Sequence, residues 1–289
     1  MVKTWPKKPY RWFQDGRWHI SIPFTWTLPQ VRQEILYRNL FNDDRPIVGG
    51  PAVKLMPDYL ADIADVGSDM LGVLQRINPN ATKTSEGCIR KCGFCAVPRI
   101  EKDFIEYESF PIRPILCDNN FMACSDKHRE SVYTKLRGLK GIDFNQGLDA
   151  RLMTKWDAEQ LTELKAITRF AWDDVRVETA VLNAIRLMKD TGLPTRYLRC
   201  YVLIGFNDTP EDALYRLTTL VAHGVRPNPM RYTPLDSLTG KYVGKNWTED
   251  ELIRYMRYWA NLRHTRGVPF KQFRCNQHYQ KTQQELAIL

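Results

Sequence analysis

The sequence predicts an α/β fold in which parallel strands alternate with helices. Short apolar segments recur roughly every 26 to 32 residues over the middle of the chain, the length that a crossover between parallel strands needs. The stretches between them carry apolar residues three and four positions apart, as on one face of a helix. Several of these stretches also begin with a helix-capping residue. We therefore expect a parallel sheet covered by helices on its outer face.

Six apolar segments supply the expected strands. They begin near Thr82, Arg113, Ile142, Thr168, Tyr197 and Pro229. In a sheet of this kind, a ligand binds at the carboxyl ends of the strands. The residues that follow each strand are therefore the candidates for a functional site.

The helices between these strands have recognisable starts. Thr209 can cap a helix with its hydroxyl group and is followed by Pro210 and two acidic residues. Thr154 begins a weaker capping box, with Asp157 where glutamate or glutamine is preferred. Apolar residues then recur with helical spacing, for example from Val181 to Met188. Both features predict helices that pack an apolar face against the sheet.

Three parts are expected along the chain. They are an aromatic and basic arm with a small α/β extension, the main α/β domain and a helical C-terminal cover, at residues 1–80, 81–240 and 241–289. The cover is expected because a helix start at Thr248 is followed by basic and aromatic residues outside the strand rhythm. We expect it to lie over the open side of the sheet and to help select the substrate.

The N-terminal extension is expected to have a βαβ-like order. His19–Ile22 alternates as a strand does, a helix runs from Thr27 to Leu40, and Pro46–Val48 is a short apolar strand. Residues 57–76 are expected to be helical and to lead into the main domain.

Three cysteines, Cys88, Cys92 and Cys95, lie just after the first expected strand. Their spacing is C-x3-C-x2-C, and Phe94 precedes the last one. A structural zinc site needs four ligands, usually from a second cysteine pair or a histidine, and this stretch holds neither. A ferredoxin motif uses four cysteines at tighter spacing. Three thiolates on a four-iron cluster would leave one iron open to a small molecule, which predicts a catalytic cluster.

The segment Cys88–Cys95, with Ser85–Gly87 before it and Ala96–Pro98 after it, resembles the signature of the radical S-adenosylmethionine superfamily. The similarity is greatest to the branch that contains methylthiotransferases and cobalamin-associated enzymes. It implies an open partial (β/α)6 barrel, a [4Fe-4S] cluster on the three cysteines, and S-adenosylmethionine on the open iron with Phe94 beside its adenine. It also implies that an electron, from a donor such as flavodoxin or ferredoxin, cleaves S-adenosylmethionine to a 5′-deoxyadenosyl radical that abstracts hydrogen from a substrate.

Two elaborations of that branch are not expected here. No cysteine precedes Cys88 in this sequence, so the second cluster of a methylthiotransferase would lack its ligands. Gly49–Pro51 resembles the end of a cobalamin-binding domain, but the Asp-x-His-x-x-Gly segment that carries the lower-ligand histidine is missing. A structural remnant is therefore expected in place of a corrinoid site.

Polar residues at the ends of the second and third strands are further candidates. The resemblance implies that Asp118, or else Asn119, contacts the amino group of S-adenosylmethionine; a role in a turn is the alternative. Gln146 is expected to face the interior and bind the cofactor. Arg151 is expected either to bind an anionic substrate group or to form a salt bridge with Asp149.

The later strands supply three more candidates, and the C-terminal part supplies a fourth. Asp173 could accept hydrogen bonds from the ribose hydroxyls or cap a helix. The resemblance implies that Gly205 allows a close approach of the adenine and that the strand of Tyr232 reads the adenine edge through its backbone; Tyr232 in the core is the alternative. Cys275 is expected to act as a hydrogen donor or second ligand near the substrate, or to be a plain buried cysteine.

The charge of the chain points to an anionic partner. The net charge is +9, and basic residues alternate with aromatic ones over residues 1–28, as in a platform for single-stranded nucleic acid. Packing of these rings on the main domain is the alternative. The rival function is a nucleic-acid-binding protein whose thiols hold zinc or a structural cluster.

The sequence also bears on location. No apolar run reaches the roughly 18 residues of a membrane span. The cysteines outside the motif are scattered, which suits reduced thiols, so we expect a cytoplasmic protein without membrane contact.

Overall fold

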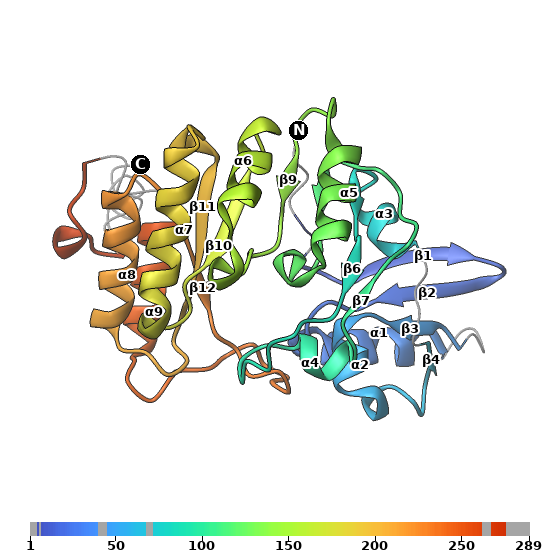
Figure 1. Ribbon diagram of the computed structural model, residues 1–289. Coiled ribbons are helices and arrows are strands. Elements are labelled where there is room, and N and C mark those ends of the chain that lie inside the picture. The colour runs from blue at the N-terminus through green and yellow to red at the C-terminus, as the bar shows by residue number, and fades with distance from the viewer. Residues whose placement is uncertain (1–4, 6, 40–44, 68–71, 262–266, 276–289) are drawn as a thin grey trace, which may run out of the picture.

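The computed structural model describes residues 5, 7–39, 45–67, 72–261 and 267–275. Six parallel strands follow one another in the main part of the chain, with helices along one side of them (Figure 1). The strands are β5 (Ala81–Thr82), β8 (Ile115–Leu116), β9 (Asp143–Phe144), β10 (Thr168–Ala171), β11 (Leu198–Ile204) and β12 (Arg226–Arg231). They pair in the orders β5-β8-β9 and β10-β11-β12.

Isolated parallel bridges join these two halves, between Asp143 and Ile167 and between Leu148 and Phe170. The expected strands are therefore present and follow the chain order. The last strand begins at Arg226, earlier than the expected start at Pro229. The sequence did not predict this earlier start because β12 contains two prolines, which usually argue against a strand. They are tolerated because β12 pairs only with β11 and forms an edge of its sheet.

The helices of the main domain lie between consecutive strands. They are α5 (Asp126–Leu136), α6 (Lys155–Glu163), α7 (Glu178–Asp190) and α8 (Pro210–Ala222). The expected capping boxes are present. The side chains of Thr154 and Thr209 each accept a hydrogen bond from the backbone N–H three residues later, and the aspartate at that position accepts one from the backbone N–H of the threonine. These helices bury their apolar faces in one large core with the strands.

The long strand β11 has two different faces. Leu198, Cys200 and the following alternate residues are fully buried, whereas Arg199 and Tyr201 are half-buried. Successive side chains of a strand point to opposite faces of the sheet. One face therefore belongs to the core with the helices, and the other carries polar side chains.

The N-terminal part forms a separate four-stranded sheet of β1 (Tyr10–Gln14), β2 (Arg17–Ser21), β3 (Ile47–Gly49) and β4 (Asp65–Val66). The strand β2, the helix α1 (Leu28–Asn39) and β3 form the expected β–α–β order, with β2 and β3 parallel. An apolar cluster of its own, distinct from that of the main domain, holds this sheet and α1 together. The short helix α2 (Pro51–Leu55) follows at Gly50, where a Cβ atom would lie 2.9 Å from the backbone of Ile22.

The expectation of a helix over residues 57–76 is wrong. The chain there forms a single turn at Pro57–Tyr59, the strand β4 and the short helix α3 (Val73–Ile77). Residues 65 and 66 form a strand in place of a helix because β4 pairs with β3 at the edge of the sheet. Asp65 of this strand also forms ion pairs with Arg17 and Arg45. These tertiary contacts outweigh a modest helical propensity.

The C-terminal part begins with α9 (Glu249–Tyr255), whose start is a capping box at Thr248, as expected. A π-helical turn, Met256–Ala260, continues it and packs against β12. Residues 262–266 and 276–289 of the expected cover lie outside the described residues. None of the helices in the described ranges has the length and apolar character to cross a membrane.

Candidate cluster and cofactor site

The three motif cysteines lie on one loop between the short strand β6 (Ser85–Glu86) and the helical turn α4 (Val97–Ile100). At the start of the loop the backbone of Gly87 packs closely against that of Asp103. A Cβ atom on Gly87 would lie 2.1 Å from the carbonyl oxygen of Asp103. Gly87 also has a φ of +80°, which favours glycine. The backbone N–H of Cys95 donates to the carbonyl of Cys92 at 3.0 Å, so the second half of the motif is a tight turn.

Two N–H groups point at the sulfur of Cys88. The side-chain amide of Asn120 and the backbone N–H of Arg90 each lie 3.3 Å from Sγ. Burial raises the pKa of the Cys92 thiol, and the charge of Arg151 opposes this rise. Burial also raises the pKa of Cys95. The thiols are thus partly desolvated, and donors to a thiolate stabilise it.

Asp118 lies behind the loop and is 3% exposed. Its Oδ1 accepts from the N–H and hydroxyl of Thr84, at 2.7 and 2.9 Å, and from both donors of Ser85. Burial raises the pKa of this carboxyl, and the four hydrogen bonds oppose the rise. Asp118 therefore ties the second strand to the segment that leads into the cluster loop, and its contact with a cofactor amine stays a prediction.

Glu101 is a further carboxylate at the loop, and the sequence analysis missed it. Lys83 forms a salt bridge with Oε1 at 2.7 Å, the N–H of Gly87 donates to Oε2 at 2.6 Å, and the amide of Asn119 also donates to Oε2. Burial opposes ionisation, but the charge of Lys83 and these donors lower the pKa of Glu101. Asn119 is therefore held by Glu101. The only sequence signal for this residue was its place just after the motif.

Asp149 joins the third strand end to the cluster loop. Its carboxylate accepts from Arg90 at 2.9 Å and from Arg151 at 2.6 and 3.0 Å. Burial opposes the effect, but these two guanidinium groups lower the pKa of Asp149. Of the two alternatives for Arg151, the structure contains the salt bridge. Gln146, which was expected to face the interior, is exposed, and its binding of a cofactor stays a prediction.

Asp173 lies at the end of β10 and is close enough to raise the pKa of Cys92 and Cys95 through its charge. Its Oδ1 accepts from the N–H of Leu203 at 3.1 Å. Burial raises the pKa of Asp173 to about 6, while that N–H and the charge of Arg216 oppose the rise. The structure thus places Asp173 within electrostatic range of Cys92 and Cys95, and its role toward the ribose hydroxyls stays a prediction.

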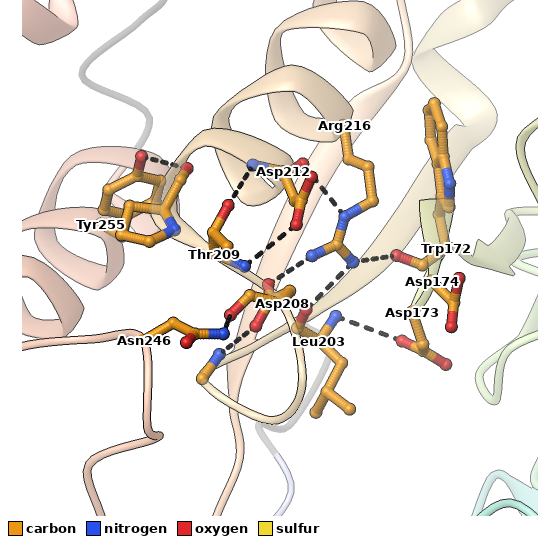
Figure 2. A network of polar contacts seen from close by, with 12 residues as sticks. Trp172, Asp173, Asp174, Leu203, Asp208, Thr209, Asp212, Arg216, Asn246 and Tyr255 are labelled. Atoms are coloured by element: carbon orange, nitrogen blue, oxygen red, sulfur yellow. Dashed lines mark hydrogen bonds and ion pairs between the residues drawn. The ribbon is translucent and has the colours of Figure 1, made fainter. Parts of the chain in front are cut away.

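A buried arginine organises the ends of β10 and β11 (Figure 2). The guanidinium of Arg216 donates to the carbonyls of Trp172 and Leu203, at 2.7 and 3.1 Å, and pairs with Asp208. Asp208 in turn accepts from the N–H of Gly205 at 2.9 Å. The sequence analysis missed Arg216. The available signal was that this arginine of α8 lies eight residues after Asp208, the acid with which it pairs.

An aromatic chain runs from the cluster loop to the last strand. Phe94 contacts Phe206 edge-on with ring centroids 5.6 Å apart, and Phe206 contacts Tyr232 at 4.7 Å. Tyr232 then meets Tyr242 at 5.3 Å. The structure therefore places Phe94 and Tyr232 in one cluster and adds two rings that the sequence analysis did not name.

Gly205 has the backbone conformation that requires glycine, with φ +82°. A Cβ atom there would lie 3.0 Å from the side chain of Leu252 in α9.

Cys275 lies in the C-terminal part of the chain, where its carbonyl oxygen accepts a hydrogen bond from Arg257 at 3.5 Å. Its role toward a substrate stays a prediction.

The donor chemistry of the cluster loop fits an iron–sulfur cluster. An iron–sulfur cluster is larger than one ion and accepts thiolates from a whole loop. Three thiols on one loop, with N–H donors at one sulfur, fit such a cluster.

Comparison with known proteins gives a match in fold only. No protein-family model and no curated protein matches the sequence. Two solved structures of the radical S-adenosylmethionine methyltransferase TsrM from Kitasatospora setae match with a TM-score of 0.55, one with cobalamin and a [4Fe-4S] cluster and the other with tryptophan and a SAM analogue. Identity is 12% and 11%, and 77% of this chain is covered. The chain spans about 65% of the length of these proteins, and it shares their fold.

Proposed function

We propose that this protein is a radical S-adenosylmethionine enzyme with one [4Fe-4S] cluster on Cys88, Cys92 and Cys95. One observation carries the proposal: a C-x3-C-x2-C loop follows the first strand of a parallel α/β sheet whose fold resembles a structure with that cluster. S-adenosylmethionine would bind the iron that the three thiolates leave open. When bound, the cluster supplies the electron for reductive cleavage of S-adenosylmethionine, which initiates hydrogen abstraction from an anionic substrate.

The residues around the loop would hold and orient these groups. Asn120 and the N–H of Arg90 would donate to the ligating sulfur of Cys88, which stabilises negative charge there. Phe94 would pack beside the adenine within the aromatic cluster that includes Tyr232. Asp173 has a carboxylate at the site with only one backbone donor, and we assign it to the ribose hydroxyls.

The proposal extends to the architecture and to partners. The six strands would form an open partial (β/α)6 barrel, with the β1–β4 sheet as a structural extension that binds no cobalamin. A small electron-transfer protein such as flavodoxin or ferredoxin would reduce the cluster. All seven cysteines are free thiols, which suits a reducing compartment, and we place the enzyme in the cytoplasm.

Anaerobic reconstitution tests the proposal. The wild-type chain should bind about four irons and four sulfides and should form 5′-deoxyadenosine from S-adenosylmethionine under reduction. Changing Cys88, Cys92 or Cys95 to Ala should abolish 5′-deoxyadenosine. Cys124→Ala is the matched control, because Cys124 lies outside the motif and should leave the product unchanged.

Two results would contradict the proposal. Turnover that persists in a motif variant would show that the thiols do not hold the catalytic cluster. Tightly bound zinc without any 5′-deoxyadenosine would favour a binding protein with a structural metal. The N-terminal rings give that rival little support, since Trp12 stacks on His19 at 5.0 Å and Trp26 on Phe24 at 4.3 Å.

A further inference from the structure

Three arginines form a row across the second half of the sheet. Arg169 on β10 is the register partner of Arg199 on β11, which is the register partner of Arg226 on β12. Neighbouring strands lie about 4.8 Å apart, and register partners in parallel strands point to the same face. Three cationic side chains therefore stand side by side.

The row lies on the face of the sheet away from the helices. Arg199 belongs to the half-buried set of β11, opposite to the buried residues that pack in the core. Tyr201, two residues further on the same face, interacts electrostatically with Arg169 and Arg199. Cys117 of the second strand end also interacts with Arg169. The arginines thus share the face of the sheet opposite the one that packs against the helices.

Only one acid compensates the row within the described residues. Arg169 donates to Asp143 at 2.9 Å and to the carbonyl of Phe144 at 3.4 Å. The Nε of Arg199 is buried without a hydrogen-bond partner, and no described acceptor binds the guanidinium of Arg226. Three arginines and one aspartate leave a net charge of +2. The buried Nε of Arg199 has an unused donor and the exposed guanidinium of Arg226 has its donors available, so both can bind a ligand with oxygen acceptors.

The electrostatic interactions within the row favour an anionic ligand. Burial lowers the pKa of Arg169 to about 10, and repulsion from Arg199 and Arg226 adds to this effect. Burial, followed by repulsion from Arg199, lowers the pKa of Arg226. Burial is the larger cause of both shifts and repulsion between the charged forms is the smaller one, and an anion between the arginines would oppose both.

We propose that the row of Arg169, Arg199 and Arg226 binds the phosphate monoester group of a small-molecule substrate. Guanidinium forks match the oxygens of phosphate in pairs. A phosphate monoester carries a charge near −2 at neutral pH, which equals the uncompensated charge of the row, whereas a carboxylate carries half of it. This assignment rests on the proposed function and names its substrate class.

The depth of the row favours a small molecule over a polymer. Arg169 is 6% exposed, and Arg199 is half-buried. Asp173 follows Arg169 by four residues, so the row lies roughly 13 Å along the strand from the cluster end. A phosphorylated metabolite of that length would have its phosphate on the row and its reacting carbon near the cluster loop. Arg226 alone of the three is exposed, and a continuous nucleic-acid backbone would need the other two to be exposed as well.

Phosphate binding to the full-length, metal-free chain tests the proposal without requiring catalysis. Inorganic phosphate, titrated in the calorimeter and in thermal unfolding, should bind the wild-type chain saturably and raise its Tm. Arg199→Gln and Arg226→Gln should each weaken binding about 10-fold or more, by loss of a charge-assisted pair. Arg196→Gln is the matched control, because Arg196 is exposed, lies three residues before Arg199 and should bind phosphate as the wild type does.

The alternatives give distinct results. The proposal is overturned if phosphate does not bind, if all variants bind it equally, or if acetate binds as tightly as phosphate. It is also overturned if single-stranded oligonucleotide binds through Arg226 while phosphate does not. Arg226 is exposed, so its variant should fold even if Arg199→Gln does not. Failure of the enzyme proposal is seen separately, as absence of 5′-deoxyadenosine from a chain that still binds phosphate.

Discussion

The two halves of the six-stranded sheet hold the site in opposite ways. In β5-β8-β9 the strands are two residues long, and two carboxylates accept from the loop: the buried Asp118 from residues 84 and 85, and the partly buried Glu101 from Gly87. In β10-β11-β12 the strands are longer, and a buried cation, Arg216, donates to strand-end carbonyls. The loop side is thus held through its N–H groups, whereas on the strand side Arg216 binds C=O groups in addition to the N–H groups that Asp173 and Asp208 accept from.

This difference follows from backbone chemistry. An irregular loop exposes N–H donors that only an acceptor can satisfy, and each donor that is buried without one is costly. Strand ends expose carbonyls, which a guanidinium with several donors can bind together. The comparison predicts that removing either buried charge destabilises its own half, and that only the loop half governs cluster retention.

The largest effect is expected from Arg216→Met. Arg216 is fully buried, and its loss leaves Asp208 and two carbonyls without their partner. Loss of one member of a buried ion pair costs about 5 kcal/mol. Denaturant unfolding of the metal-free chain measures the loss, with Arg176→Gln as the control because Arg176 is almost fully exposed. A loss below about 1 kcal/mol, the range of exposed pairs, would mean that Arg216 does not organise the strand ends.

A somewhat smaller effect is expected from Asp118→Ala. The backbone N–H groups of Thr84 and Ser85 would lose their acceptor, at a cost of about 4 kcal/mol for the two together. Iron content after reconstitution should fall together with stability, whereas Arg216→Met should lose stability with less loss of iron per folded chain. Equal iron loss in both variants would contradict the division between the two halves.

The smallest effect is a pH dependence at Asp173. Its pKa in the folded chain is about 6, above its ordinary value of 3.8, so the folded state holds the proton more tightly. The stabilisation is fully present below pH 3.8 and is lost as pH rises through 6, with a total of at most about 3 kcal/mol. The free energy of unfolding of metal-free wild type should therefore fall relative to Asp173→Asn between pH 4 and 7. A constant difference between the two proteins would contradict this shift.

Much of the fold followed from local patterns in the sequence. Apolar segments and capping residues predicted the strand order and the helix starts, because both depend on nearest neighbours and on the period of buried residues. The exceptions, β4 and the early start of β12, arise where sheet pairing at an edge prevails over propensity and over prolines. No local pattern encodes such pairing.

The site divides in the same way. The sequence by itself determined the spacing of the three thiols, from which we predict a cluster, because spacing within one loop is a local property; the loop follows the first strand of the parallel set. Only the tertiary structure decided that Glu101 binds Gly87, that Arg216 joins two strand ends, and that three arginines share a register. Contacts between residues distant in the chain depend on how strands pair and on which groups burial leaves without water, and these are properties of the folded chain.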